Sequence, residues 1–196
     1  DRLYLDSLAP LSLKEAFPVN ASIIDVGTGA GFPGLPLAIA RPDLSVMLLD
    51  SLNKRLKFLA AVVEELGLKN VRLCHARAED GGRDPAHRER YDRAVARAVA
   101  PLPVLCELLL PMVKPGGEML CYKGPAAQEE WQAGQKAAAL VGGGGLENVP
   151  VVLPTQPQWQ HCVVRCPKLH KTGKQYPRKA GTPAKEPLGG YVKPKV

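Results

Sequence analysis

Three glycines follow a short apolar run, and their spacing is typical of a turn that binds a small ligand. The apolar run is Ser22–Ile24, and the glycines are Gly27, Gly29 and Gly31. Glycine lets the backbone approach a ligand closely where a buried strand ends and a helix begins. Pro33 follows, and proline suits the first turn of a helix because its missing N–H is not needed there. The sequence therefore predicts a strand, a ligand-binding turn and a helix, in that order.

The spacing and a nearby carboxylate indicate which ligand this turn binds. Dinucleotide-binding turns follow the pattern G-x-G-x-x-G, which needs a glycine at the position that Phe32 occupies. Asp25 lies two residues before the first glycine, where its charge would repel a pyrophosphate. A cationic ligand that carries an amino acid and a ribose tolerates this charge. We therefore predict S-adenosylmethionine as the cofactor, with Asp25, Gly27 and Gly29 at its site. Phe32 either covers the cofactor or packs in the core.

Polar residues also follow the next three predicted strands. Asp50, Glu79 and Arg97 come at or just after the ends of apolar runs, and in open parallel sheets ligands bind beyond the C-terminal strand ends. We expect Asp50 to accept hydrogen bonds from both ribose hydroxyls, which contributes roughly 1.5–3 kcal/mol. An acid or a backbone group at Glu79 would receive the adenine amino group, and Arg97 needs an anionic partner. The alternatives are a helix cap at Asp50 and solvent-exposed side chains at the other two positions.

The alternation of elements predicts the fold class. Expected strands cover residues 22–26, 45–49, 71–75, 91–95, 118–122, 148–153 and 160–166, and expected helices cover 3–17, 33–40, 52–66, 103–113 and 128–141. Residues 81–90 are expected to form a polar loop. This order predicts an α/β, Rossmann-like fold with a mostly parallel central sheet, helices on both faces and an antiparallel strand near the C-terminus.

The positive charge of the chain is concentrated in its last thirty residues. The net charge is +7, yet residues 1–166 hold 18 basic and 18 acidic residues, whereas 167–196 hold eight basic residues and one acidic residue. The tail also contains five prolines and four glycines, so we expect it to be flexible. A flexible basic arm indicates a polyanionic partner; a merely solubilising terminus is the alternative.

Several classes of protein and site are disfavoured. The five cysteines show no C-x-x-C pair, and we expect them to be buried thiols in a reducing cytoplasm. No histidine has a metal-ligand spacing, so no metal is predicted. No apolar run approaches 18 residues, and the start does not resemble a signal peptide, so we expect a cytoplasmic protein with no membrane partner. The chain begins at Asp1 without methionine, and we expect further residues to precede it.

Longer motifs now carry a specific resemblance. The chain resembles the bacterial small-subunit ribosomal RNA guanine-N7 methyltransferase G family, also called glucose-inhibited division protein B. The matching segments are 5–8 (Leu-Asp-Ser-Leu), 24–34, 49–55, 97–98 and the tail segment 176–183 (Tyr-Pro-Arg-Lys-Ala-Gly-Thr-Pro). Together they extend over essentially the whole chain.

The resemblance implies both a reaction and its residues. Gly27, Phe32, Ala78, Glu79 and Arg97 would contact S-adenosylmethionine. The reaction would methylate N7 of a specific guanine in 16S ribosomal RNA by direct in-line transfer. The lone pair of N7 is free at neutral pH, so no general base is needed and no catalytic residue is assigned; positioning can supply up to roughly 7–11 kcal/mol.

The resemblance also implies a domain organisation and partners. Residues 1–20 would be the remnant of an N-terminal helical segment, 21–166 the methyltransferase domain and 167–196 the RNA-contacting tail. Lys123, Arg178 and Lys179 are the candidate RNA-binding residues, although Lys123 could equally be an ordinary surface lysine. The partner would be 16S ribosomal RNA or the small ribosomal subunit. The sequence is silent on oligomeric state, and we favour a monomer.

Two other functions remain open at this point. A methyltransferase of the same fold could act on a small molecule or a protein, although the basic tail argues against this. Alternatively, the chain could be a non-enzymatic RNA-binding protein that has kept the fold of a cofactor-binding enzyme.

Overall fold

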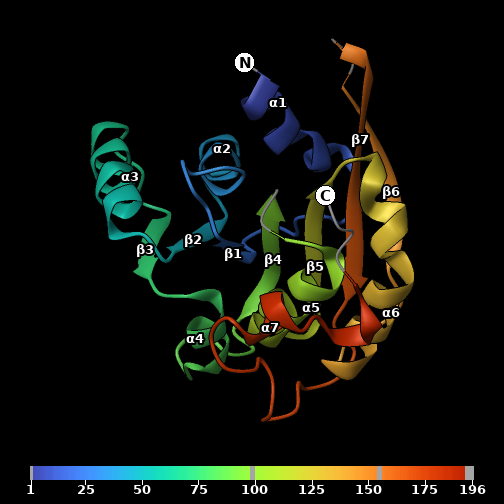
Figure 1. Ribbon diagram of the computed structural model, residues 1–196. Coiled ribbons are helices and arrows are strands. Elements are labelled where there is room, and N and C mark those ends of the chain that lie inside the picture. Colours follow the sequence, from blue (N-terminus) through green and yellow to red (C-terminus); the bar gives the residue numbers. More distant parts are fainter. Residues whose placement is uncertain (1, 98–99, 154–155, 193–196) are drawn as a thin grey trace.

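A seven-stranded sheet forms the centre of the molecule (Figure 1). The computed structural model describes residues 2–97, 100–153 and 156–192, without the side chains of 2, 125–127, 152, 153 and 156–161. The strands are β1 (Ser22–Val26), β2 (Ser45–Asp50), β3 (Val71–His75), β4 (Tyr91–Arg97), β5 (Val113–Lys123), β6 (Glu147–Leu153) and β7 (Gln156–Pro167). Their order is β3-β2-β1-β4-β5-β7-β6. β1 to β5 pair in parallel and β7 runs antiparallel to both neighbours. The predicted Rossmann-like fold is confirmed.

Helices cover both faces of this sheet. They are α1 (Arg2–Leu8), α2 (Gly34–Ala40), α3 (Asn53–Glu65), α4 (Ala78–Arg83), α5 (Leu102–Leu109), α6 (Trp131–Leu140) and α7 (Thr182–Lys185), with 3₁₀ turns η1 (Ala9–Ser12), η2 (Leu110–Met112), η3 (Pro125–Glu130) and η4 (Leu188–Gly190). Successive strand residues point to opposite faces. Leu48 accordingly packs in one core with Leu37 of α2, while Leu49 packs in the other with Leu105 of α5. In the described part of the chain, no helix is long and apolar enough to cross a membrane.

Several expected elements differ from the structure. The helix expected over 103–113 ends at Leu109, and the strand expected over 118–122 begins already at Val113. The helix expected over 3–17 ends at Leu8, because Pro10 lies in the 3₁₀ turn that follows. The polar loop expected over 81–90 begins inside helix α4, which ends at Arg83. Acidic side chains in the first turn of α4 and the basic Arg83 in its last turn favour this helix, despite its two glycines.

The described part of the tail packs against the body, which differs from the expectation of a flexible arm. The ammonium group of Lys168 is fully buried and donates to the carbonyl oxygens of Leu110 and Val113. The guanidinium of Arg88 donates to the carbonyls of Thr172, Gly173 and Tyr176. The tail has too few apolar residues for a core of its own, but these charged donors hold its backbone to the body. In Figure 1 its red ribbon runs beside α4 and α5.

Candidate functional site

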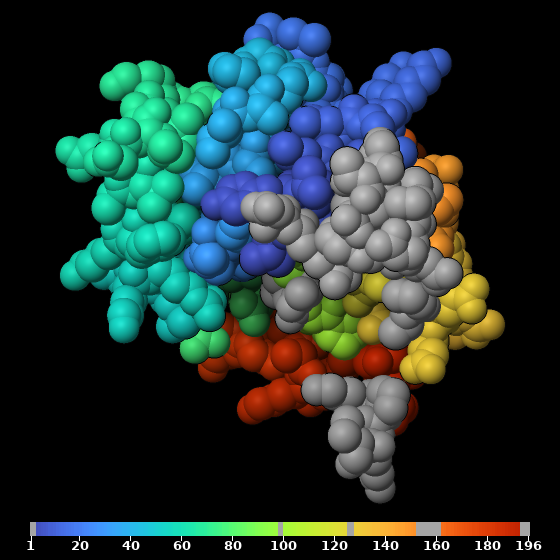
Figure 2. Space-filling view, turned by 90° about the horizontal axis from the view of Figure 1, so that it is seen from above, coloured from blue at the N-terminus to red at the C-terminus, as the bar shows by residue number. Residues whose placement is uncertain are grey.

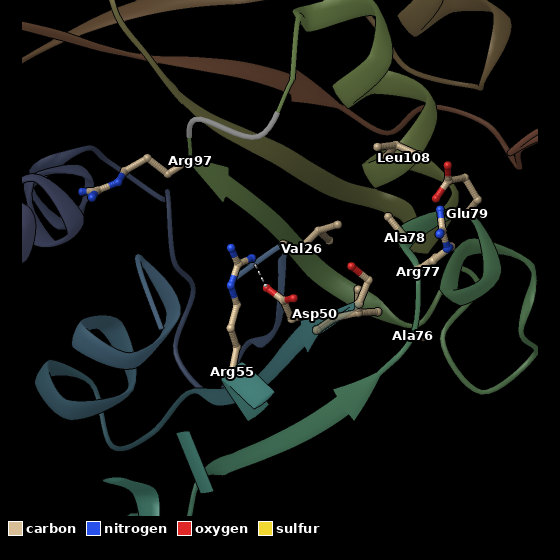
Figure 3. Close-up of a pocket in the computed structure, with 12 residues that line it drawn as sticks. Val26, Asp50, Arg55, Ala76, Arg77, Ala78, Glu79, Arg97 and Leu108 are labelled. Carbon is tan, nitrogen blue, oxygen red and sulfur yellow. Dashed lines mark hydrogen bonds and ion pairs between the residues drawn. The ribbon is translucent and has the colours of Figure 1, made fainter. Parts of the chain in front are cut away.

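A cavity of about 400 Å³ lies at the C-terminal ends of β1 to β4. Five predicted cofactor residues line it: Gly27, Asp50, Ala78, Glu79 and Arg97. They come from four different strand ends, and Figure 3 shows Asp50 near the centre of the view with Arg97 to its left and Glu79 to its right. The crossover connections of a parallel sheet bring these ends to one edge. The structure therefore assembles the predicted strand-end residues into one site.

The carboxylate of Asp50 is held by the backbone around it. Its side chain is 2% exposed. Its Oδ2 accepts from the N–H of Gly29 at 2.9 Å, and its Oδ1 accepts from the N–H of Leu52 at 2.8 Å. The Leu52 contact lies just before α3, whose first turn receives no side-chain cap, so the alternative of a helix cap at Asp50 is wrong. The Asp50 side chain lines the cavity. Gly29 lies outside the lining but fixes the orientation of Asp50.

Asp25 lies behind the turn rather than in the cavity lining. Its fully buried Oδ2 accepts from the hydroxyl of Thr28 at 2.7 Å and from the N–H of Gly34 at 2.8 Å. Burial raises its pKa to about 6, against the opposing effect of these two donors. The structure therefore gives Asp25 the task of ordering the glycine turn and the start of α2, which differs from the predicted cofactor contact.

Arg97 joins the cavity to the N-terminal helix. Its Cζ lies 5.6 Å from the centroid of the Phe32 ring, and the ring of Tyr4 meets Phe32 edge-on with centroids 5.0 Å apart. The Nη1 of Arg97 donates to the carbonyl of Leu3 at 3.3 Å. In Figure 3 the Arg97 side chain points away from Glu79. Phe32 lies outside the cavity lining and instead supports Arg97 through a cation–π contact.

A second cavity of about 240 Å³ adjoins the first at Arg97. Its other walls come from α1, η1, β5, β6 and β7 and are mostly apolar. Asp6 of α1 and Lys123 of β5 contribute charge to this lining. Figure 2 shows the surface above the strand ends, with the N-terminal residues in blue at the top, α3 in teal at the left and C-terminal residues in red along the bottom.

The three predicted RNA-binding residues have different surroundings. The ammonium group of Lys123 lies 2.7 Å from the carboxylate of Glu130. Arg178 forms an ion pair at 2.7 Å with Glu107, whose side chain is fully buried. The side chain of Lys179 is exposed. Of the three, Lys179 is thus the one whose side chain is open to solvent.

Among the lining residues that were not predicted from the sequence, two come from helices α3 and α5. Arg55 reaches the cavity from the first turns of α3, and Leu108 reaches it from α5. Arg55 lies in one of the motifs that carried the family resemblance, which was the available signal. Leu108 follows no strand end and carries no polar group, so only the packing of α5 brings it to the site.

The residues of the first cavity fit the cofactor that the sequence predicts. The carboxylates of Asp50 and Glu79 can accept from hydroxyl and amino donors, and the apolar Leu49 and Leu108 can face a flat ring. Gly27 adopts a φ of 72°, a conformation that favours glycine. Because glycine has no side chain, a ligand can approach the backbone of the turn closely. Among the described residues there is no cluster of three or more histidine, cysteine or carboxylate groups suited to a metal.

Comparison with known proteins agrees with this geometry. Residues 1–157 match the model of the GidB family, described as rRNA small subunit methyltransferase G. A relative from Alkaliphilus metalliredigens, named ribosomal RNA small subunit methyltransferase G, is 48% identical over 188 residues, which span 94% of this chain and 77% of the relative. A relative of the same name from Lactobacillus acidophilus is 44% identical over 186 residues, again 94% and 77%.

Solved structures share the fold at lower identity. The antibiotic-resistance methyltransferase Kmr is similar at a TM-score of 0.59 and 18% identity, over 76% of this chain and 87% of Kmr. The S-adenosylmethionine-dependent methyltransferase SibL is similar at 0.64 and 21% identity, over 85% of this chain and 55% of SibL. Fold, cavity and sequence similarity agree, and the chain belongs to the GidB family of rRNA small subunit methyltransferases G.

Proposed function

We propose that the protein transfers a methyl group from S-adenosylmethionine to N7 of a guanine in 16S ribosomal RNA. The observation that carries this proposal is the convergence of Gly27, Asp50, Glu79 and Arg97 on one cavity in a chain of this family. The names of its relatives support the RNA substrate. A ribosomal RNA substrate in turn favours a cytoplasmic protein.

The chain's own residues hold and orient the methyl donor. Asp50, already fixed by two backbone donors, accepts from ribose hydroxyls, and Glu79 accepts from the adenine amino group. Gly27 leaves room for the backbone to approach the ligand. When bound, the cofactor supplies an electrophilic methyl group on a positively charged sulfur. The two carboxylates also favour a cationic ligand over its neutral product.

The acceptor guanine fits the second cavity, which shares Arg97 with the first. Enzymes that act on an unstacked base bind it between apolar or aromatic side chains and hydrogen-bond its Watson–Crick edge. Asp6 contributes a carboxylate to this mostly apolar lining, and a carboxylate oxygen can accept from the N1–H or the N2 amino group of guanine. Adenine presents an acceptor at N1 and would be rejected. Because N7 needs no deprotonation, the residues act by positioning.

Methyl transfer tests the function. Tritiated S-adenosylmethionine should label small-subunit ribosomal RNA, either free or in the ribosomal particle, and the label should map to a guanine N7. Asp50→Asn should weaken S-adenosylhomocysteine binding by about 10–100-fold, equivalent to about 1.4–2.8 kcal/mol, and reduce labelling accordingly. Glu65→Gln, an exposed position at the end of α3, is the matched control. Cofactor binding without labelling of any ribosomal RNA would overturn the substrate assignment.

Asp6→Asn tests the acceptor cavity separately. The amide keeps the size of the side chain but loses one acceptor oxygen and the charge, so transfer to RNA should fall at least tenfold while S-adenosylhomocysteine affinity stays unchanged. Asp84→Asn changes an exposed carboxylate that lines neither cavity and is the control. Full transfer by the Asp6 variant would place the base elsewhere.

A further inference from the structure

The tail segment 176–181 contacts α4 and α5, the two helices that line one side of the proposed cofactor cavity. On α4, the Nε of Arg83 donates to the carbonyl of Pro177 at 2.7 Å. Gly82 packs so closely that an added Cβ would lie 2.8 Å from the Pro177 ring. Figure 1 shows the C-terminal ribbon beside α4 and α5. The contacts join the tail to the helix that carries Ala78 and Glu79.

The attachment to α5 is an ion pair between the partly exposed Arg178 and a buried carboxylate. Glu107 is fully buried, and its Oε1 accepts from the backbone N–H of Arg178 at 2.8 Å and from its Nε at 2.9 Å. Its Oε2 accepts from Nη2 of Arg178 at 2.7 Å. The next residue, Leu108, lines the cofactor cavity. Removing Arg178 would leave a buried charge without its partner, so this pair fixes the tail strongly.

One tail contact reaches a cofactor residue directly. The N–H of Gly181 donates to Oε1 of Glu79 at 2.8 Å, and Glu79 is 9% exposed. Gly181 has a φ of +85°, a conformation that favours glycine, and it lies three residues after the Arg178 anchor. A carboxylate has acceptor capacity on both oxygens, so Oε2 can accept from a ligand while Oε1 is held by the tail.

We propose that segment 176–181 positions Glu79 for the adenine end of the cofactor, with Arg178 as its anchor. Arg178 is then a positioning residue for the methyl donor. The RNA is instead contacted by exposed lysines of the same tail, such as Lys174 and Lys179. RNA that shifts the tail changes cofactor affinity, and the cofactor changes RNA affinity by the same factor. The inference rests on the proposed function in taking the ligand to be S-adenosylmethionine.

Binding calorimetry with two ligands tests this role. S-adenosylhomocysteine carries the adenine amino group, whereas S-inosylhomocysteine has a carbonyl oxygen there. The wild type should prefer the adenosyl ligand. Arg178→Ala should weaken the adenosyl ligand about tenfold and the inosyl ligand much less, so that the preference shrinks. Lys171→Ala, which removes an exposed tail charge outside segment 176–181, is the matched control and should change neither affinity.

A double variant tests whether Arg178 acts through Glu79. Glu79→Gln with Arg178→Ala should bind the adenosyl ligand no more weakly than Glu79→Gln alone, because the affected contact is already changed. If Arg178→Ala does not fold, Gly181→Ala takes its place. Its Cβ meets nothing within 4 Å, so it strains only the segment that contacts Glu79, and the same loss of preference is expected.

Three outcomes would overturn the proposal while leaving the proposed function intact. The first is an adenosyl-ligand affinity that is unchanged in the folded variants. The second is an equal loss of affinity for both ligands, which would indicate a merely structural role. The third is a wild type that binds both ligands with the same affinity. Failure of the proposed function is separate: a wild type that binds both ligands with the expected preference but methylates no RNA leaves this inference intact. A wild type that binds neither ligand overturns both.

Discussion

The guanidinium of Arg55 lies over the carboxylate of Asp50, with 3.3 Å between Nη1 and Oδ2 (Figure 3). Arg55 is 52% exposed and Asp50 is 2% exposed, so an exposed cation pairs with a buried anion. A ribose hydroxyl that donates to Oδ2 would compete with this guanidinium. The pair therefore opposes the cofactor contact that Asp50 is proposed to make.

Replacing Arg55 should reveal this competition. Arg55→Met keeps the apolar stem and removes the charge, and we expect S-adenosylhomocysteine to bind up to about fivefold more tightly, because exposed ion pairs contribute about 0–1 kcal/mol. Calorimetry measures the change, and Lys57→Met on the same helix is the control. Weaker binding would mean that Arg55 itself holds the ligand.

The buried Asp25 should make stability depend on pH. Its pKa is about 6 in the folded chain and 3.8 without the fold. The folded state therefore holds more protons between these values, and the stability contribution present below pH 3.8 is lost as the pH rises through about 6. The difference is about 3 kcal/mol.

Asp25→Asn removes this titration while keeping an acceptor for Thr28 and Gly34. Chemical denaturation across pH 4–7 should show a wild-type free energy of unfolding that declines relative to the variant. Parallel curves for the two proteins would contradict the assignment.

Lys168 should stabilise the junction between body and tail. Lys168→Met leaves the buried carbonyls of Leu110 and Val113 without their donor, and we expect the free energy of unfolding at pH 7 to fall by about 2–4 kcal/mol. The exposed Lys171→Met is the control.

The titration of Lys168 adds a second readout. Burial lowers its pKa to about 8 from 10.5. The unfolded state then binds more protons between these values, so the contribution of Lys168 to wild-type stability rises with pH over this range. The stability difference from the Met variant should widen accordingly; a constant difference would contradict the lowered pKa.

Lys179 should contribute to RNA affinity without affecting the cofactor. Lys179→Ala should weaken binding to small-subunit ribosomal RNA and lower the salt slope of the binding constant by about 0.7, the value for one lost phosphate contact on a single strand. Filter binding over a range of salt concentrations measures this slope. A slope equal to that of the wild type would show that Lys179 touches no phosphate.

The order of elements was predictable because it is local. Apolar runs such as Val46–Leu49 predict strands, and helical spacing such as Leu56 to Leu59 predicts a helix. The C-terminal ends of parallel strands share one edge, so Gly27, Asp50 and Glu79 could be placed together before any contact was known. Helix α4 was not predicted because it contains Gly81 and Gly82, and glycine has a low helix propensity.

The sequence by itself determined the fold class, the strand-end residues that line the first cavity and the family. Only the tertiary structure decided that Asp25 orders the turn, that Leu108 reaches the cavity and that the described tail is packed. Each of these depends on contacts between distant residues, such as Arg178 with Glu107 and Gly181 with Glu79. The composition gives the net charge of the tail, but it does not show that Arg178 is paired with the buried carboxylate of Glu107 on α5.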